Sequence, residues 1–120
     1  MRIFIICSVR KADMEEASRQ EEYVRRLEDA GHIVHYPPRN TDQEARGIDI
    51  CRQNVAAIIA ADEIHVFYSP DSQGTHFDLG CAFTLGKKLV VVESISYGPG
   101  KGYPRMIDKW AACRSIDICE

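Results

Sequence analysis

Two short polar segments hold most of the residues that could do chemistry in this 120-residue chain. The first, Cys7-Ser8-Val9-Arg10, follows an apolar run and precedes a helical pattern. A hydroxyl, a guanidinium and free backbone N–H groups at a helix start suit an anion such as a phosphate. The alternative is that Ser8 caps the helix while Arg10 is a solvated charge, and this segment alone favours neither. It lacks the glycine spacing of a dinucleotide-binding loop or a P-loop.

The second segment runs from Ser69 to Gly80 and begins with turn-forming residues. Gly74 would let the backbone approach a ligand closely, and Ser72 and Thr75 supply hydroxyl groups. Asp78 is a lone acid in an apolar stretch, so a carboxylate facing a crevice there is a candidate nucleophile or base. The alternative, which this segment favours by itself, is a capping box between Thr75 and Asp78.

One amide and the histidines complete the candidates. Asn54 lies at the flank of the apolar face of a predicted helix, where it could bind a sugar hydroxyl or orient an acid, or simply be a half-exposed surface residue. His76 is adjacent to Asp78, but helical neighbours do not share a face, so a Ser/His/Asp triad has weak support. The other histidines lack an acid or cysteine at metal-ligand spacing, so no metal site is expected: His32, His35 and His65.

The elements that must position these residues alternate between strands and helices. Apolar, β-branched runs predict strands at 2–7, 32–36, 63–68 and 88–93, with an edge strand at 114–119. Apolar residues at helical spacing predict helices at 13–30, 48–61, 77–86 and 103–112. The first of these helices stops at Gly31, and the polar residues 39–46 predict a loop.

This order predicts a single α/β domain spanning residues 1–120. We expect a three-layer, flavodoxin-like or Rossmann-like fold with a five-stranded parallel sheet of order 2-1-3-4-5 and helices on both faces. Ligands of such sheets bind beyond the carboxyl ends of the strands, where the strand order reverses. The segments 7–11, 69–78 and 93–103 would therefore lie side by side.

Composition narrows the possible partners. The formal net charge of -3 argues against binding to a nucleic-acid polymer. No run approaches the length of a membrane span, and the apolar start is too short for a signal peptide, so we expect a cytoplasmic protein with no membrane association.

The cysteine count is odd and shows no zinc or redox spacing, which predicts reduced, mostly buried thiols: Cys7, Cys51, Cys81, Cys113 and Cys119.

Taken in order, these segments resemble the nucleoside 2-deoxyribosyltransferase superfamily, including its 2′-deoxynucleoside 5′-monophosphate N-glycosidase branch. The family signature Gly-(Thr/Val)-x-x-Glu-Leu-Gly compares with Gly74-Thr75-His76-Phe77-Asp78-Leu79-Gly80. A Gly-Ser-Ile-Arg-like turn compares with Cys7-Ser8-Val9-Arg10, and an acid eight residues before the aspartate of an Ala-Asp pair compares with Asn54 before Asp62. Pro104-Arg105-Met106-Ile107 looks like the segment that reaches a neighbouring subunit's site in the family.

The resemblance implies glycosyl transfer without a cofactor. The signature carboxylate attacks the anomeric carbon and expels the nucleobase, and water or a second base resolves the intermediate. Asp78 would be the nucleophile, Asn54 would contact the sugar, and Ser8, Arg10 and Ser72 would hold a 5′-phosphate. The full set of substrate-binding residues would be Cys7, Ser8, Val9, Arg10, Ser69, Ser72, Gly74, Thr75 and Met106.

Two positions depart from the family, and they leave several functions open. Asp78 replaces a glutamate and is one methylene shorter, by roughly 1.5 Å of reach, and Asn54 replaces an aspartate. An N-glycosidase or transferase acting on a nucleoside or nucleotide is the leading hypothesis. A non-catalytic sensor of a nucleotide-derived ligand and an interaction protein that keeps only the scaffold are the alternatives.

The resemblance also implies a homo-oligomer, because the family builds its sites across subunits. The aromatic residues in and after the glycine-rich loop suit an interface between copies: Tyr97, Tyr103 and Trp110. The alternative is that these side chains only cover the edge of the sheet.

Overall fold

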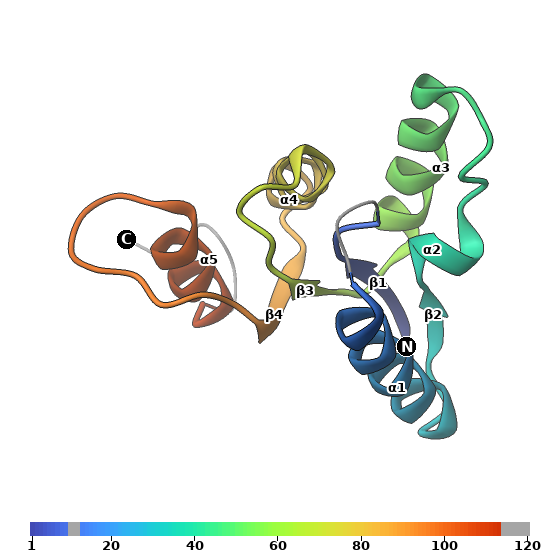
Figure 1. Cartoon of the computed structure of the whole chain (residues 1–120), viewed down its shortest axis with the longest axis horizontal. Helices are drawn as coiled ribbons and strands as arrows, with labels where there is room; N and C mark the ends of the chain where they lie inside the picture. The colour runs from blue at the N-terminus through green and yellow to red at the C-terminus, as the bar shows by residue number, and fades with distance from the viewer. Residues whose placement is uncertain (10–12, 114–120) are drawn as a thin grey trace.

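The structure, a computed structural model, describes residues 1–9 and 13–113. Strands and helices alternate along these residues, as Figure 1 shows. The elements are β1 (Arg2–Ile6), α1 (Met14–Asp29), β2 (Ile33–His35), α2 (Pro37–Asn40), α3 (Gly47–Ala60), β3 (Glu63–Phe67), α4 (Gln73–Thr84), β4 (Lys88–Glu93) and α5 (Tyr103–Ala111). No helix among the described residues is long and apolar enough to cross a membrane.

The described strands form one parallel sheet in the order β2-β1-β3-β4. This confirms the predicted parallel sheet and the order of its first four strands. The described sheet has four strands and not the expected five, and the edge strand predicted at 114–119 lies outside the described residues. The strand order reverses between β1 and β3, so the carboxyl ends of these two strands flank the place where such sheets bind ligands.

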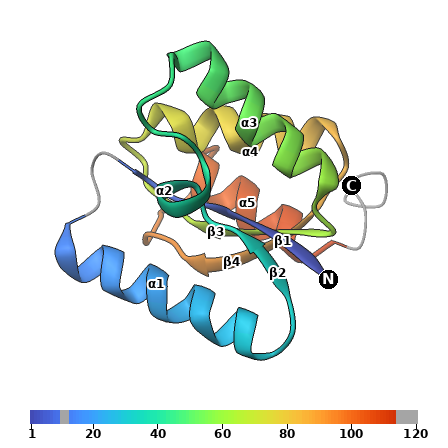
Figure 2. The same cartoon turned by 90° about the vertical axis from the view of Figure 1, so that its right-hand side faces the viewer.

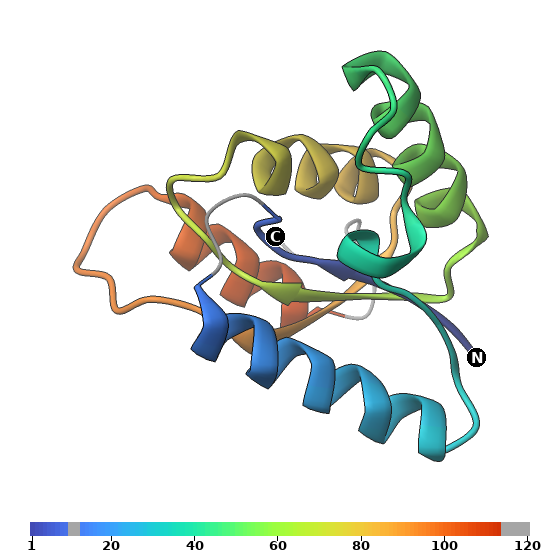
Figure 3. The same cartoon turned by 45° about the vertical axis from the view of Figure 1, so that its right-hand side comes forward.

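Helices cover both faces of the sheet, as predicted. α1 lies on one face, and α3, α4 and α5 lie on the other (Figures 2 and 3). Alternate residues of β1 point to opposite faces: Ile3 and Ile5 pack in the core beneath α1, whereas Phe4 and Ile6 pack with α3, α4 and α5. Burial on both faces explains why β1 is a continuous apolar run.

The ends of α1 follow the expected helix signals. The Asp13 side chain accepts a hydrogen bond of 2.8 Å from the backbone N–H of Glu16 and caps the first turn. The helix ends before Gly31, whose φ of 95° is a left-handed conformation that favours glycine. Gly31 therefore acts as the predicted stop.

The proline pair that ends β2 also begins a short helix. Residues 39–46 were expected to be a loop, but Arg39 and Asn40 belong to α2, and their backbone N–H groups donate to the Tyr36 carbonyl at 2.9 and 2.8 Å. Proline suits the first turn of a helix because its φ is already helical and its missing N–H would have no partner there. The loop prediction is therefore wrong for these two residues.

α4 begins at Gln73, four residues before the expected start at Phe77. Ser72 is its N-cap, and its hydroxyl oxygen accepts a 3.1 Å hydrogen bond from the backbone N–H of Thr75. The suggested capping box between Thr75 and Asp78 is wrong, because Asp78 lies in the second turn of the helix. Its carboxylate is therefore not used for capping.

The redox state of the described cysteines differs from the prediction at one position. Cys7, Cys51 and Cys81 are free, whereas Cys113 is disulfide-bonded. The expectation of reduced thiols is therefore wrong at Cys113. Only Cys7 of the three free cysteines is fully buried.

Candidate functional site

A cavity of about 420 Å³ opens at the carboxyl ends of β1 and β3. Its volume lies within the range of small-molecule binding sites. The turn after β1, one face of α3 and the start of α4 form its wall. It brings together seven of the residues that the sequence singled out: Cys7, Ser8, Val9, Asn54, Ser72, Gly74 and Asp78.

Burial strongly raises the pKa of Asp78, one of the acids in this cavity wall. Its side chain projects from the second turn of α4, and the residue is 6% exposed. No hydrogen bond within the described part of the chain reaches its carboxyl group. Burial raises its pKa from 3.8 to about 7, because an apolar environment disfavours the charged form. Near neutral pH the group can therefore either attack as a carboxylate or accept a proton.

Asn54, on α3, lines the same cavity, and a hydrogen bond to a residue outside the cavity wall holds its side chain. The Thr41 hydroxyl donates a hydrogen bond of 2.7 Å to Asn54 Oδ1, and His35 Nε2 lies 2.8 Å from the same hydroxyl oxygen. Thr41 is 4% exposed. The Asn54 amide is thus part of an internal chain of hydrogen bonds as well as part of the cavity wall.

The side of the cavity expected to bind an anion is formed by two segments. Ser8, which is buried, follows β1, and Ser72 and Gly74 surround the start of α4. The backbone N–H groups of a first helical turn favour negative charge. Arg10, which the sequence also places here, lies outside the described residues.

Three predicted site residues lie elsewhere. Ser69 lines a smaller adjoining cavity of about 280 Å³, which shares Ser8 and Asp71 with the first one. Thr75 is fully buried and faces the core. Met106, on α5, lines a separate cavity of about 710 Å³ in the glycine-rich loop region. The structure therefore places Ser69 and Met106 in other cavities than Asp78, whereas Thr75 precedes Asp78 by three residues on the same helix but is not part of the cavity wall.

Sequence reasoning missed several residues of the wall. Asp71 and Gln73 lie just before and at the start of α4, and the rest come from the segment 37–50, which comprises α2, the following loop and the first turn of α3: Pro37, Gln43, Gly47 and Ile50. A signal for this segment was present, because β2 pairs with β1 in parallel and its carboxyl end must lie beside that of β1. Within this segment, residues 39–46 are polar and suggest only a loop, which gives Gln43 no functional signal of its own.

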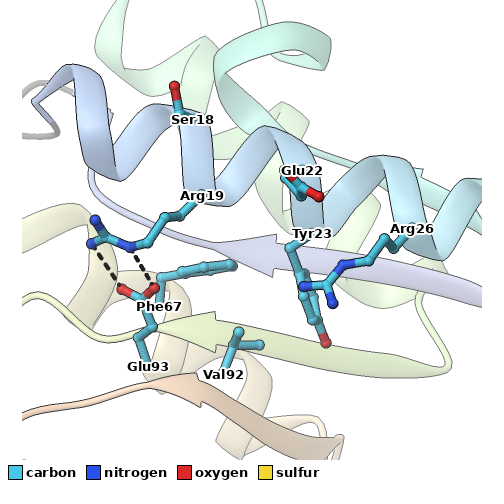
Figure 4. A pocket seen from close by; sticks show the side chains of 8 residues that line it. All are labelled: Ser18, Arg19, Glu22, Tyr23, Arg26, Phe67, Val92 and Glu93. Atoms are coloured by element: carbon cyan, nitrogen blue, oxygen red, sulfur yellow. Dashed lines mark hydrogen bonds and ion pairs between the residues drawn. The ribbon is translucent and has the colours of Figure 1, made fainter.

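A further cavity of about 310 Å³ lies on the opposite face of the sheet, between α1 and β4 (Figure 4). Arg19 spans it and pairs with Glu93, with Arg19 Nε 2.8 Å from Glu93 Oε2. Tyr23 also lines it, and the Tyr23 hydroxyl lies 2.6 Å from His65 Nδ1. His65 Nε2 lies 3.0 Å from Glu63 Oε1. These contacts join α1 to β3 and β4, away from Asp78.

No metal site accompanies these groups in the part of the chain that the structure describes. Clusters of three or more histidine, cysteine, aspartate or glutamate side chains in a metal-binding arrangement are absent from residues 1–9 and 13–113.

The parallel sheet, whose strand order reverses between β1 and β3, defines an α/β protein, and the candidate cavity with Asp78 lies beside this reversal. The fold resembles a 2-deoxyribosyltransferase of Bacillus psychrosaccharolyticus, with a TM-score of 0.66, 21% identity, and coverage of 80% of this chain and 77% of that one. It also resembles the CMP N-glycosidase BcmB of Clostridium botulinum, with a TM-score of 0.61, 26% identity, and coverage of 76% and 70%.

A third solved structure is similar to a comparable degree. The 2-desoxiribosyltransferase of Leishmania mexicana has a TM-score of 0.60 and 23% identity, over 77% of this chain and 63% of that one. No family model matches the chain, and no curated protein sequence does. The structures confirm, at the level of the fold, the resemblance to the nucleoside 2-deoxyribosyltransferase superfamily.

Proposed function

We propose that this chain cleaves the N-glycosidic bond of a nucleoside or a nucleoside 5′-monophosphate, with Asp78 as the nucleophile. The observation that carries the proposal is the Asp78 carboxyl group in the cavity wall, which is used neither for capping nor for a hydrogen bond among the described residues. The likeness to a CMP N-glycosidase at 26% identity supports the same chemistry.

The reaction has two steps. An Asp78 carboxylate oxygen attacks C1′ of the sugar, the bond from C1′ to the base nitrogen breaks, and its electron pair leaves with the base. Water then attacks C1′ and releases Asp78, giving the sugar or sugar phosphate, while the proton lost by water balances the proton gained by the base. A second base in place of water would make the protein a transferase.

The wall offers a place for each part of a nucleotide. Ser8, Ser72 and Gly74 lie where a 5′-phosphate would meet the start of α4, and Arg10 is proposed to join them. Cys7 and Val9 would contact the sugar or base from the end of β1. Because Asp78 is shorter than a glutamate by roughly 1.5 Å, the sugar must lie correspondingly closer to α4.

Subunit assembly is a separate part of the proposal. Met106 is 38% exposed and lines a different cavity from that of Asp78. We propose that it contacts a second copy of the chain, as the family resemblance implies. Light scattering after size exclusion measures the oligomer directly.

A second candidate function is a binding module that retains the cavity without the reaction. It is favoured by Asn54, which cannot supply the proton that an acid at this position would give. In that case nucleotides would bind and raise the thermal midpoint through mass action, but no base would be released.

Incubation with a panel of nucleosides and their 5′-monophosphates, followed by chromatography of the free base, tests the proposal. We expect base release from at least one compound with the natural chain and none with Asp78→Asn. Binding without release would support the module. Neither binding nor release, by a folded protein, would contradict both functions.

A further inference from the structure

We infer that the substrate is a nucleoside 5′-phosphate whose phosphate carries a second, hydroxylated ester group, and that this group binds in the cavity lined by Gln20. The Gln20 cavity is the one of about 280 Å³ that also contains Ser69. The inference rests on the proposed function and deepens it by naming the substrate class. A buried amide donor and two carboxylates in this cavity carry it.

The Gln20 cavity continues the Asp78 cavity along the carboxyl edge of the sheet. The two cavities share Ser8 and Asp71. Ser8 is one of the residues proposed to hold the 5′-phosphate, so this phosphate would lie at the border between them. A group esterified to the phosphate would then enter the Gln20 cavity. A water molecule occupies about 30 Å³ in the liquid, so a cavity of about 280 Å³ has room for about nine groups of that size.

Gln20, on α1, presents a fixed hydrogen-bond donor to this cavity. The residue is 4% exposed, and the Tyr36 hydroxyl donates a hydrogen bond of 2.9 Å to its Oε1 atom. Burial is the main cause that raises the pKa of Tyr36 to about 12, so this hydroxyl keeps its proton near neutral pH. The Gln20 Nε2 amino group remains for the cavity, with no hydrogen-bond partner among the described residues. A buried donor of this kind requires an acceptor from a ligand or from water.

Two carboxylates line the same cavity. Glu16 lies one turn before Gln20 on α1, and Glu93 is the last residue of β4. Arg19 holds Glu93 in place, with Nε 2.8 Å and a terminal guanidinium nitrogen 3.3 Å from its two oxygens (Figure 4). No lysine, arginine or histidine of residues 1–9 and 13–113 lines the Gln20 cavity. Its lining therefore combines one neutral donor with an excess of negative charge.

This combination separates three kinds of polar group that a phosphate ester could carry. A second phosphate would accept a hydrogen bond from Gln20 Nε2, but Glu16 and Glu93 would repel it. An ammonium group would be attracted by the carboxylates, but it has no acceptor for the Gln20 donor. A hydroxyl group both donates and accepts, so it can satisfy the amide and a carboxylate together.

The remaining wall suits the carbon atoms of such a group. Phe67, Pro70 and Ile95 line the Gln20 cavity together with the polar residues. These side chains offer van der Waals contacts to a carbon chain, whereas its hydroxyl groups meet Gln20 and Glu16. A small polyol, such as a glyceryl group, matches both parts of the lining and the volume.

The first experiment measures binding by calorimetry to Asp78→Asn, which cannot turn the compounds over. The probes are the glyceryl and propyl esters of deoxycytidine and deoxyadenosine 5′-monophosphates, which differ within each pair only in two hydroxyl groups. We expect the glyceryl ester of at least one nucleoside to bind about tenfold or more tightly than its propyl ester. Equal affinities of the two esters for both nucleosides would overturn the inference.

The corresponding nucleoside diphosphates test the charge argument. They place a second phosphate where the glyceryl group is proposed to lie, so we expect them to bind more weakly than the glyceryl esters. Diphosphates that bind as tightly as the glyceryl esters would overturn the exclusion of a second phosphate and, with it, the inferred substrate class.

Variants of the cavity then assign the preference to its residues. Gln20→Glu keeps an oxygen for Tyr36 and replaces the amino donor with an acceptor, and Glu16→Gln removes one carboxylate. Each should lower the ratio of glyceryl to propyl affinity severalfold, and the ratio cancels the effect of the altered charge on the phosphate, which both esters share. Glu15→Gln is the matched control, because Glu15 is exposed in the same first turn of α1 and does not line the Gln20 cavity.

The outcome of these variants is decisive even if Gln20→Glu fails to fold. Glu16 is only half-buried, so its substitution tests the same cavity without a change in the core. A ratio that Glu16→Gln leaves unchanged, or that Glu15→Gln lowers equally, would overturn the inference.

Release of free base by the natural chain separates the inference from the proposed function. A binding preference for the glyceryl ester without base release from any of these compounds contradicts the proposed function alone. Base release with the same kcat/KM for the glyceryl and propyl esters contradicts the inference and leaves the proposed function in place.

Discussion

The thiol of Cys7 and the carboxyl group of Asp78 lie in the wall of the same cavity, close enough for the charge of Asp78 to affect the pKa of Cys7. Burial is the larger cause, and together the two effects raise the pKa of Cys7 to about 12. The same kind of burial brings the pKa of Asp78 to about 7. Near neutral pH the carboxyl is therefore the group of this pair that ionises.

Cys7 should resist alkylation in the folded protein. With a pKa of about 12, only about one molecule in ten thousand carries the thiolate at pH 8. Iodoacetamide labelling followed by peptide mass spectrometry measures this, and the same reaction in concentrated urea shows that the peptide is detectable. Rapid labelling of Cys7 without denaturant would mean that the end of β1 is more open than its burial indicates.

Base release should depend on pH through the ionisation of Asp78. Only the carboxylate can attack C1′, so kcat should rise about tenfold per pH unit below pH 7 and level off above it. The measurement is a pH profile of kcat with the best substrate of the panel. A rate that falls as the pH rises through 7 would show that the protonated acid is the active form.

The stability of the protein should also depend on the ionisation of Asp78. It should fall as the pH rises, whereas the rate of base release should increase. In the unfolded chain this carboxyl titrates near pH 3.9, whereas its folded pKa is about 7. Between these values the native state binds more protons than the unfolded state, so the free energy of unfolding falls as the pH rises. Asp78→Asn removes this effect and should be more stable than the natural chain at pH 8, by up to roughly 4 kcal/mol.

Urea unfolding of both proteins at pH 5 and pH 8 tests this expectation. The difference in the free energy of unfolding should be much smaller at pH 5, where the native carboxyl is protonated. A constant difference at both pH values would indicate a packing effect of the substitution rather than the cost of a buried charge.

Most of the fold could be predicted because most of its elements have one strong signal in the sequence. β1 consists, after Arg2, of isoleucines and one phenylalanine that are buried on both faces, and α1 has a capping aspartate at one end and Gly31 after the other. α2 could not be predicted in the same way. Pro37 and Pro38 both end a strand and suit a helix start, and the sequence alone does not decide between these roles.

The candidate site was partly predictable for a related reason. The rule that ligands bind at the carboxyl ends of parallel strands places Ser8, Ser72 and Asp78 together, and all three line the cavity. The position of Thr75 was not predictable, because a serine and a threonine three residues apart can each begin a helix. Since Ser72 is the N-cap, Thr75 faces the core.

Ser72 should have two roles that different substitutions separate. Ser72→Ala removes the N-cap of α4 and should lower the free energy of unfolding by about 1 kcal/mol. Ser72→Asp keeps a good cap but places a negative charge where the phosphate is proposed to bind. We expect it to be as stable as the natural chain and to weaken the binding of a nucleoside monophosphate more than that of the nucleoside. Equal weakening for both compounds would place the phosphate elsewhere.

Replacement of Thr75 by valine should stabilise the protein. The Thr75 hydroxyl oxygen is fully buried and has no hydrogen-bond partner among the described residues, and an unsatisfied buried hydroxyl costs about 1 to 3 kcal/mol. Valine has nearly the same shape and a similar helix propensity, so Thr75→Val should raise the urea midpoint. Thr75→Ser, which keeps the hydroxyl and loses the methyl group, should lower it. If Thr75→Val were instead the less stable variant, the hydroxyl would have to satisfy a partner in solution, and Thr75 would again be a candidate for contact with a ligand.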